Sequence, residues 1–208
     1  MRRKAFLGSK RIPSHGFSLV EVVIALAVIL ILSAVALPAF VNAYRMYQLT
    51  DAATQFAGLL KFTRFEAIRL NTNVNFQIQQ TASVPPVTNM WADSLPTPQD
   101  GVEDPSEKQL LFSGTVNLVP TAAVPNAAGL AAASGVPALV TVPLANGFVT
   151  FDRRGAVFFN PPNPPQVYVF YLTNQNDPSV GARAVVLLPS GSIQIWKADS
   201  LGNWISLG

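Results

Sequence analysis

Residues 17–40 read FSLVEVVIALAVILILSAVALPAF and carry one charge, that of Glu21. As an α-helix this stretch would be about 36 Å long, enough to cross the ~30 Å hydrocarbon layer of a bilayer. Five basic residues precede it: Arg2, Arg3, Lys4, Lys10 and Arg11. Because basic residues stay on the cytoplasmic side, the pattern predicts a membrane helix whose N-terminus is cytoplasmic.

Three interpretations of this segment compete. A secretory signal would have an A-x-A-like cleavage site, which Ala34-Val35-Ala36 imitates, but the apolar run is long for that class. A plain single-pass anchor explains the length and leaves Glu21 unexplained, because a carboxylate in a membrane helix costs a few kcal/mol and usually has a partner. The third interpretation depends on a family resemblance.

The segment Gly16-Phe17-Ser18-Leu19-Val20-Glu21 resembles the prepilin peptidase recognition motif of type IV pilins and type II secretion pseudopilins. The resemblance implies that residues 1–16 form a basic leader, cut between Gly16 and Phe17, and that Phe17 is N-methylated. It also implies that Glu21, the fifth mature residue, pairs with the Phe17 amine of a neighbouring subunit during assembly. Pro38 matches the family's helix-kinking proline at the twenty-second mature position.

The charge balance changes if the leader is removed. From Phe17 onward the chain has nine basic and eleven acidic residues, a formal charge of −2 against +3 for the full chain. The high isoelectric point is therefore no argument for nucleic-acid binding. The absence of cysteine excludes disulfides, thiol catalysis and thiolate metal sites. The single histidine, His15, lies in the leader.

Residues 41–70 continue the helix with an amphipathic pattern. Apolar or small residues recur at steps of three and four: Val41, Tyr44, Leu49, Ala52, Ala53, Phe56, Leu59, Leu60, Thr63, Ala67 and Leu70. We expect this stripe to pack on a globular head, Glu66 and Arg69 to pair on the helix surface, and the helix to end at Asn71-Thr72-Asn73.

Residues 71–208 predict a β-rich periplasmic domain. Val74, Phe76 and Ile78 alternate with polar residues, and later strand candidates are 110–119, 147–151, 156–159, 167–173, 183–188 and 192–197. Residues 152–155 and 189–191 read as hairpin turns. Residues 81–108 and 120–146 read as loops. The expected fold class is α+β: a long N-terminal helix with an antiparallel β-sheet head, similar to pilins.

Three segments sharpen the resemblance to GspH/FimT-type pseudopilins. Residues 59–69, with Asn71 and Val74, look like their stalk-to-sheet junction. Residues 151–155 resemble their Phe-x-x-x-Gly turn, and 183–193 resemble their closing strand, glycine turn and strand. The length of 120–146 departs from the compact family pattern.

Other candidate sites have plainer explanations. The acids Asp93, Asp100, Glu103, Asp104 and Glu107 could gather calcium, but no EF-hand spacing is present, so we expect a solvated acidic loop. Arg153, Arg154, Arg183 and Lys197 could form a DNA-binding patch, although Arg154 as a turn residue and Arg183 as a solubilising residue at a strand edge fit better. Trp196 and Trp204 are expected to pack the C-terminal sheet. We expect no enzyme, cofactor or metal.

The sequence thus predicts a structural subunit, a pseudopilin or minor pilin of a type II secretion pseudopilus or a type IV pilus. The resemblance implies four partners: other pilins, prepilin peptidase, the inner membrane and its assembly platform. The alternatives are a DNA-binding minor pilin of natural transformation and a membrane-anchored domain outside any filament. The sequence leaves open which of the two filament systems it serves and whether it is a major or minor subunit.

Overall fold

The computed structural model describes residues 18–94, 99–136, 138–159 and 164–207. The predictions for the leader, including His15 and Gly16, and for Phe17 lie outside these ranges. The chain divides into two compact units, which meet between Val41 and Asn42 and are described separately.

Helix α1 runs from Leu19 to Leu70 and contains Pro38. Ser18 caps its start, because its Oγ accepts a hydrogen bond from the backbone N–H of Glu21 at 3.2 Å. Its end is a Schellman motif. Asn71 adopts a left-handed conformation (φ 51°), and the Thr72 N–H bonds to the Ala67 carbonyl at 3.2 Å. The predicted helix end is confirmed.

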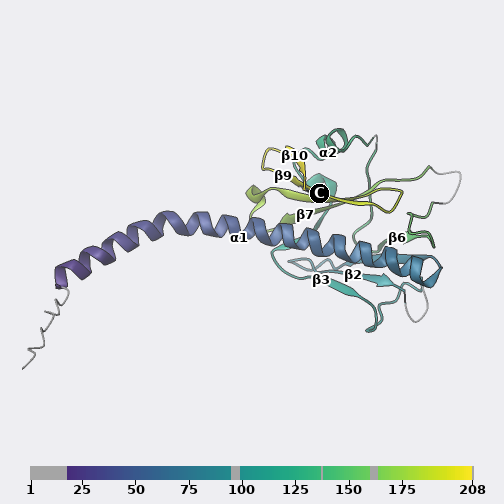
Figure 1. Cartoon of the computed structure of the whole chain (residues 1–208), viewed down its shortest axis with the longest axis horizontal. Helices are drawn as coiled ribbons and strands as arrows, with labels where there is room; N and C mark the ends of the chain where they lie inside the picture. The colour runs from purple at the N-terminus through teal and green to yellow at the C-terminus, as the bar shows by residue number, and fades with distance from the viewer. Residues whose placement is uncertain (1–17, 95–98, 137, 160–163, 208) are drawn as a thin grey trace, which may run out of the picture. The chain divides into compact units, whose positions relative to one another are not determined.

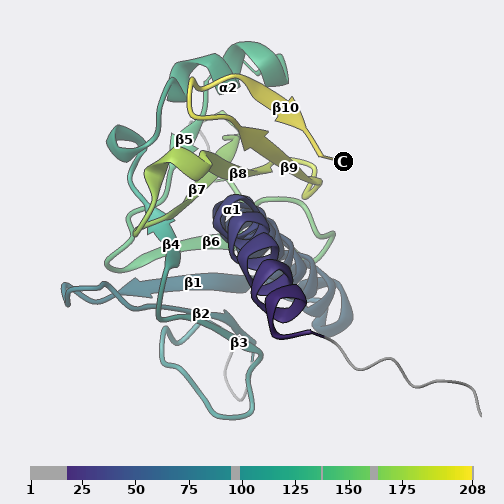
Figure 2. The ribbon, with the colours of Figure 1, turned by 90° about the vertical axis from the view of Figure 1, so that its left-hand side faces the viewer.

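The described residues of the head, from Asn42 onward, form two sheets (Figures 1 and 2). The first has the order β3-β2-β1-β6 and is antiparallel throughout. Its strands are β1 (Val74–Gln80), β2 (Thr88–Asp93), β3 (Gln109–Phe112) and β6 (Gly147–Phe151).

The second sheet has the order β10-β9-β8-β7-β4, again antiparallel. The short strand β5 (Val140–Thr141) adds one parallel pairing to β7. The other strands are β4 (Val116–Val119), β7 (Tyr168–Asn174), β8 (Ala182–Leu187), β9 (Ile193–Ala198) and β10 (Trp204–Ser206). The α+β fold class is therefore confirmed.

The main core lies where α1 meets both sheets. Figure 2 shows the two sheets as separate layers beside the helix. The predicted stripe is buried from Leu49 to Ala67, whereas Val41 and Tyr44 are exposed. Phe56 of α1, Phe76 of the first sheet and Phe170 of the second are in mutual contact, with ring centroids 4.9 to 6.0 Å apart. Such tilted and edge-to-face pairs stabilise beyond the area they bury.

A second cluster covers the opposite face of the second sheet. Helix α2 (Ala127–Ser134) and the 3-10 turn η1 (Thr121–Ala123) lie in the segment read as a loop. Leu130 of α2 is fully buried in this cluster, together with Tyr171 and Trp204. The Trp204 indole N–H donates to the Asn126 carbonyl at 3.0 Å. The interpretation of 120–146 as a loop was therefore wrong where α2 and β5 form.

Other strand predictions need correction as well. Residues 81–108 contain β2, so the loop interpretation fails at 88–93. The candidate 110–119 is two strands separated by a turn, and 156–159 forms an isolated bridge from Val157 to Phe151. Strand β10 was not predicted. Its polar neighbours Gly202 and Asn203 and its three-residue length leave little alternation to detect.

Candidate functional site

The N-terminal part of α1 is the first candidate site. Its large apolar side chains are exposed along the whole stretch: Leu19, Val20, Val22, Val23, Ile24, Leu26, Val28, Ile29, Leu30, Ile31, Leu32, Val35, Leu37 and Phe40. Among the described residues, α1 is the one helix long and apolar enough to cross a membrane. A continuous apolar surface of this size needs lipid or other proteins to cover it.

Glu21 lies in the first turn of this helix. It stands three residues after the cap Ser18, the spacing of a capping box, where a carboxylate interacts favourably with the free N–H groups of the helix start. Within the described residues its carboxylate makes no ion pair. Glu21 is therefore available for a partner outside this chain.

The junction of α1 with the head brings together the three segments that carry the GspH/FimT resemblance. An Arg64 Nη of the helix donates to the Gly191 carbonyl of the β8–β9 turn at 3.1 Å. Gly155 of the turn after β6 lies against both residues. Segments 59–69, 151–155 and 183–193, far apart in sequence, thus meet around one arginine.

Two of these positions accept only glycine. Gly155 and Gly191 both have φ +77°, where a side chain is strained. A Cβ on Gly191 would lie 2.0 Å from the Gly155 carbonyl oxygen, and a Cβ on Gly155 would lie 2.7 Å from Ile68 Cδ1. The close approach of two turns to a helix explains why both turns contain glycine.

A second set of contacts fixes α1 at the start of the head. Arg45 forms an ion pair with Asp177, whose side chain is 18% exposed. The hydrogen bond from Ser179 and the charge of Arg45 lower the pKa of Asp177, against the opposing effect of desolvation. Arg183 donates two hydrogen bonds to Thr50 Oγ1, at 3.1 and 3.0 Å.

Arg183 is 3% exposed, and burial lowers its pKa. It lies on β8, an interior strand of its sheet. The prediction of a solubilising residue at a strand edge was therefore wrong, because the guanidinium points into the head and binds α1. The surface pair Glu66–Arg69 does form, although Glu66 itself is 9% exposed.

The acidic residues separate into two kinds. Asp93 is fully buried and accepts hydrogen bonds from the Gln77 side chain and the backbone N–H groups of Gln99 and Gly101, at 2.9–3.0 Å. Glu107 is 6% exposed and accepts from the Ser94 N–H at 2.7 Å. The expectation of a solvated acidic loop fails for these two, which anchor the segment over the first sheet.

Asp100 and Glu103 are exposed, and Asp104 is half-buried, as expected of surface acids. Neighbouring Ser106 lowers the pKa of Asp104 through hydrogen bonds. Among the described residues no group of three or more histidines, cysteines or acids is placed to hold a metal ion.

The four basic residues considered for DNA do not form one patch. Arg153 and Arg154 are exposed in the turn beside Gly155, where the Arg154 N–H bonds to Asp152 Oδ1 at 2.8 Å. Arg183 is buried. Lys197 lies near the end of β9 that is remote from the Gly191 turn, which itself contacts Gly155.

Trp196 and Trp204 both pack the C-terminal sheet as predicted. Trp204 is 9% exposed and its ring lies 6.1 Å from that of Tyr171. Trp196 is half-buried against the same cluster.

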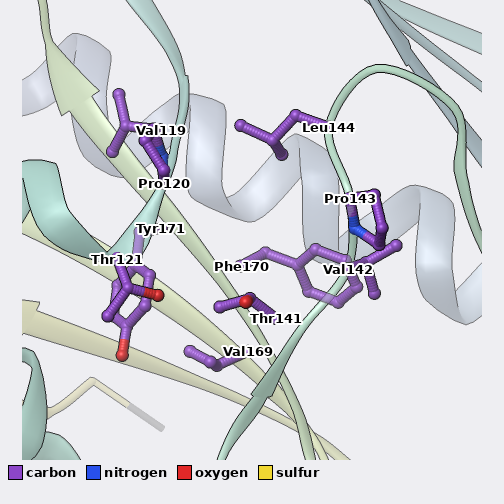
Figure 3. Close-up of a pocket in the computed structure, with 10 residues that line it drawn as sticks. All are labelled: Val119, Pro120, Thr121, Thr141, Val142, Pro143, Leu144, Val169, Phe170 and Tyr171. Carbon is purple, nitrogen blue, oxygen red and sulfur yellow. The ribbon is translucent and has the colours of Figure 1, made fainter.

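A cavity of about 240 Å³ lies beside β7 (Figure 3). It opens where β7 changes partner, from β5 at Val169 to β4 at Tyr171. Its lining is mainly apolar, with polar groups from Thr121, Thr141 and Tyr171. These groups include no carboxylate, imidazole or amine, so the lining offers no acid–base pair for catalysis.

An apolar N-terminal helix with an acidic residue in its first turn, joined to a β-rich head, defines a pilin-like structural subunit of the pseudopilin and minor pilin class. Residues 12–37 match the prokaryotic N-terminal methylation motif. Residues 52–191 match the type II transport protein GspH family, and this match covers more than half of the chain. The chain belongs to that family.

Among solved structures, the type IV minor pilin FimU of Pseudomonas aeruginosa (strain PAO1) is similar, with 15% sequence identity and a TM-score of 0.45. The alignment covers 72% of this chain and 88% of that one. None of the curated proteins compared with the sequence matches it.

Proposed function

We propose that this chain is made as a precursor, cut by prepilin peptidase between Gly16 and Phe17, and N-methylated on Phe17. Before assembly, the mature subunit is anchored in the inner membrane as a single-pass protein with a periplasmic head. An inner-membrane assembly platform then transfers it into a pseudopilus or pilus. Members of pilin and pseudopilin families are structural proteins, and we propose a structural role without catalysis here.

The observation that carries this proposal is the exposed apolar surface of residues 19–40 with Glu21 at its start. In a filament core the N-terminal amine released by cleavage would be surrounded by apolar side chains. A buried cation is costly unless an anion pairs with it. Glu21 is the one acidic residue in this stretch, so it supplies the partner for the Phe17 amine of a neighbouring subunit.

Pro38 has a supporting role in this proposal. It removes one backbone donor from α1 close to the end of the apolar stretch, and a proline inside a helix favours a bend. We propose that a bend here would lie between the part of α1 that packs in the filament core and the part that packs on the head.

Processing is tested by co-expressing the full chain with a prepilin peptidase and measuring the mass and N-terminal sequence of the product. We expect a chain that starts at methylated Phe17, and an uncut chain when the peptidase is omitted. A product that starts at any other residue contradicts the proposed cleavage site.

Assembly is tested by replacing Glu21 with Gln, which keeps the size of the side chain and removes its charge. We expect the processed E21Q subunit to accumulate in the membrane and to be lost from sheared filaments. The matched control is Asp51→Asn, an exposed acid on the same helix that lies in the head. Normal incorporation of E21Q would contradict the assembly role of Glu21. Absence of the wild-type subunit itself from sheared filaments would favour a membrane-anchored domain that acts outside any filament.

A further inference from the structure

Two turns of the head lie beside the residues with which α1 enters it. Asn42 and Met46 of α1 line a shallow pocket of about 240 Å³ together with Ser179, Val180, Asp199 and Ser200. Ser179 and Val180 belong to the 3-10 turn η2 (Pro178–Val180). Asp199 and Ser200 belong to the turn between β9 and β10. All of these residues belong to the unit that begins at Asn42.

Chain connectivity places Asn42, the first residue of the head, close to the end of the apolar run. Asn42 is two residues beyond Phe40, and two residues of α-helix rise by about 3 Å. The proposed membrane segment ends at Phe40. Asn42, which lines the same pocket as these turns, therefore lies within about one helical turn of the residue at which the proposed membrane segment ends.

The exposed side chains that follow the apolar run are of types found where a bilayer meets water. Tyr44 and Tyr47 are 54% and 68% exposed. Tyrosine is enriched where membranes meet water, because its ring is apolar and its hydroxyl is polar. Leu201, in the turn that contributes Asp199 and Ser200, is 79% exposed.

The turn that carries Leu201 is held in place from both sides. The Asp199 carboxylate accepts hydrogen bonds from the N–H groups of Leu201 and Asn203, both at 2.9 Å. The Gly202 carbonyl accepts a bond from the Asn126 side chain at 3.1 Å. The Leu201 side chain itself belongs to neither hydrophobic cluster of the head, so it is available for an external apolar partner.

We propose that the turns 177–181 and 199–203 rest on the phospholipid surface of the membrane that holds the subunit before assembly, with Leu201 inserted between lipid headgroups. This inference depends on the proposed membrane anchoring. Arg45, the basic residue near these turns, is paired with Asp177, and the Asp199 carboxylate accepts backbone hydrogen bonds and keeps its negative charge. The contact is therefore apolar and does not require anionic lipid.

The absence of cysteine from the sequence makes the test direct. Three single-cysteine variants of the full chain, Leu201→Cys, Ser190→Cys and Leu30→Cys, are labelled with an environment-sensitive dye and reconstituted into phosphatidylcholine vesicles. Ser190 is the matched control, because it is an exposed residue in the turn at the other end of β9, about 20 Å from Leu201 along the strand. Leu30 reports the anchoring of α1.

With lipids that carry a nitroxide quencher at the headgroup, we expect the dye at 201 to show blue-shifted emission and loss of fluorescence, and the dye at 190 to show neither. If the dye at 30 stays in water, the membrane anchoring itself fails. If the dye at 30 lies in lipid while those at 201 and 190 behave alike, the surface contact is overturned. If the dye at 201 responds only to anionic lipid and loses its response in high salt, the contact is electrostatic. This result would overturn the proposal of an apolar contact.

Discussion

The guanidinium of Arg64 donates a hydrogen bond to the carbonyl oxygen of Gly191, a residue 127 positions further along the chain, at 3.1 Å. This bond ties the helix to the β8–β9 turn at the point where Gly155 also approaches. The carbonyl is reachable because neither turn has a side chain there. The junction of helix and head thus depends on one arginine and two glycines.

Replacing Gly191 with Ala should destabilise the head by at least about 2 kcal/mol, since a left-handed residue costs about 1–2 kcal/mol and the overpacking against Gly155 costs about 1–3 more. The measurement is urea unfolding of the full chain in detergent micelles. Gly135→Ala is the control, because Gly135 has a similar φ of +69° with no atom within 4 Å of the new Cβ. Equal effects of the two variants would show that the contact with Gly155 does not matter.

Replacing Asp93 with Asn should free the segment 94–108 from the first sheet. Two backbone N–H groups and the Gln77 amide donate to this buried carboxylate, and an amide nitrogen in place of one oxygen leaves donors unpaired. We expect a loss of about 1–3 kcal/mol and faster proteolytic cleavage between residues 94 and 108. Glu103→Gln, an exposed position in the same segment, should leave the cleavage rate unchanged. Cleavage of D93N at the wild-type rate would contradict the anchoring role.

The contact between Arg183 and Thr50 can be tested from the helix side. Thr50→Val removes the hydroxyl that accepts two bonds from the buried guanidinium, so we expect a loss of about 1.5–3 kcal/mol in thermal or urea unfolding. Thr54→Val is the control, because its hydroxyl bonds to the Thr50 carbonyl of its own helix and should change stability by less than about 0.5 kcal/mol. If T50V and T54V are equally stable, the arginine does not hold the helix.

Asp177 should make the head sensitive to acid. Its pKa is lowered in the folded state, chiefly by the Ser179 hydrogen bond and also by Arg45, so the unfolded chain binds its proton more tightly. Its contribution is complete above the usual aspartate pKa of about 3.9 and is lost as the pH falls through the lower folded value. Asp177→Asn should lower the Tm near neutral pH and show a flatter decline of Tm below about pH 4. Parallel Tm curves for D177N and wild type would contradict this role.

The sequence was most informative where the burial of apolar side chains alone determines the structure. The apolar run of 17–40 predicts the membrane helix, and the stripe from Leu49 to Ala67 predicts the buried face of α1. The glycine turns at 155 and 191 were predicted, but their meeting at Arg64 was not, because spacing within one segment carries no information about contacts between distant segments.

Burial of polar groups was harder to predict. Asp93, Glu107 and Arg183 all read as surface residues, and all are less than 9% exposed. Hydrogen bonds to residues distant in sequence, such as that of Arg183 to Thr50, satisfy them, and sequence patterns do not show such partners. The Ala-rich segment with α2 read as a loop because Pro125, Gly129 and Gly135 interrupt its pattern. Its helix is short and is fixed by Leu130 packing on the sheet, a contact that local propensity does not reveal.

The aromatic trio of Phe56, Phe76 and Phe170 has a mechanical consequence. Any load on a pilin-like subunit, whether during extraction from a membrane or in a filament under tension, reaches the head through α1. Because Phe56 touches one ring from each sheet, a pull along the helix is shared between both sheets at the same point. Both sheets then bear the force at the same time. Neither sheet has to separate from the helix before the other one begins to bear load.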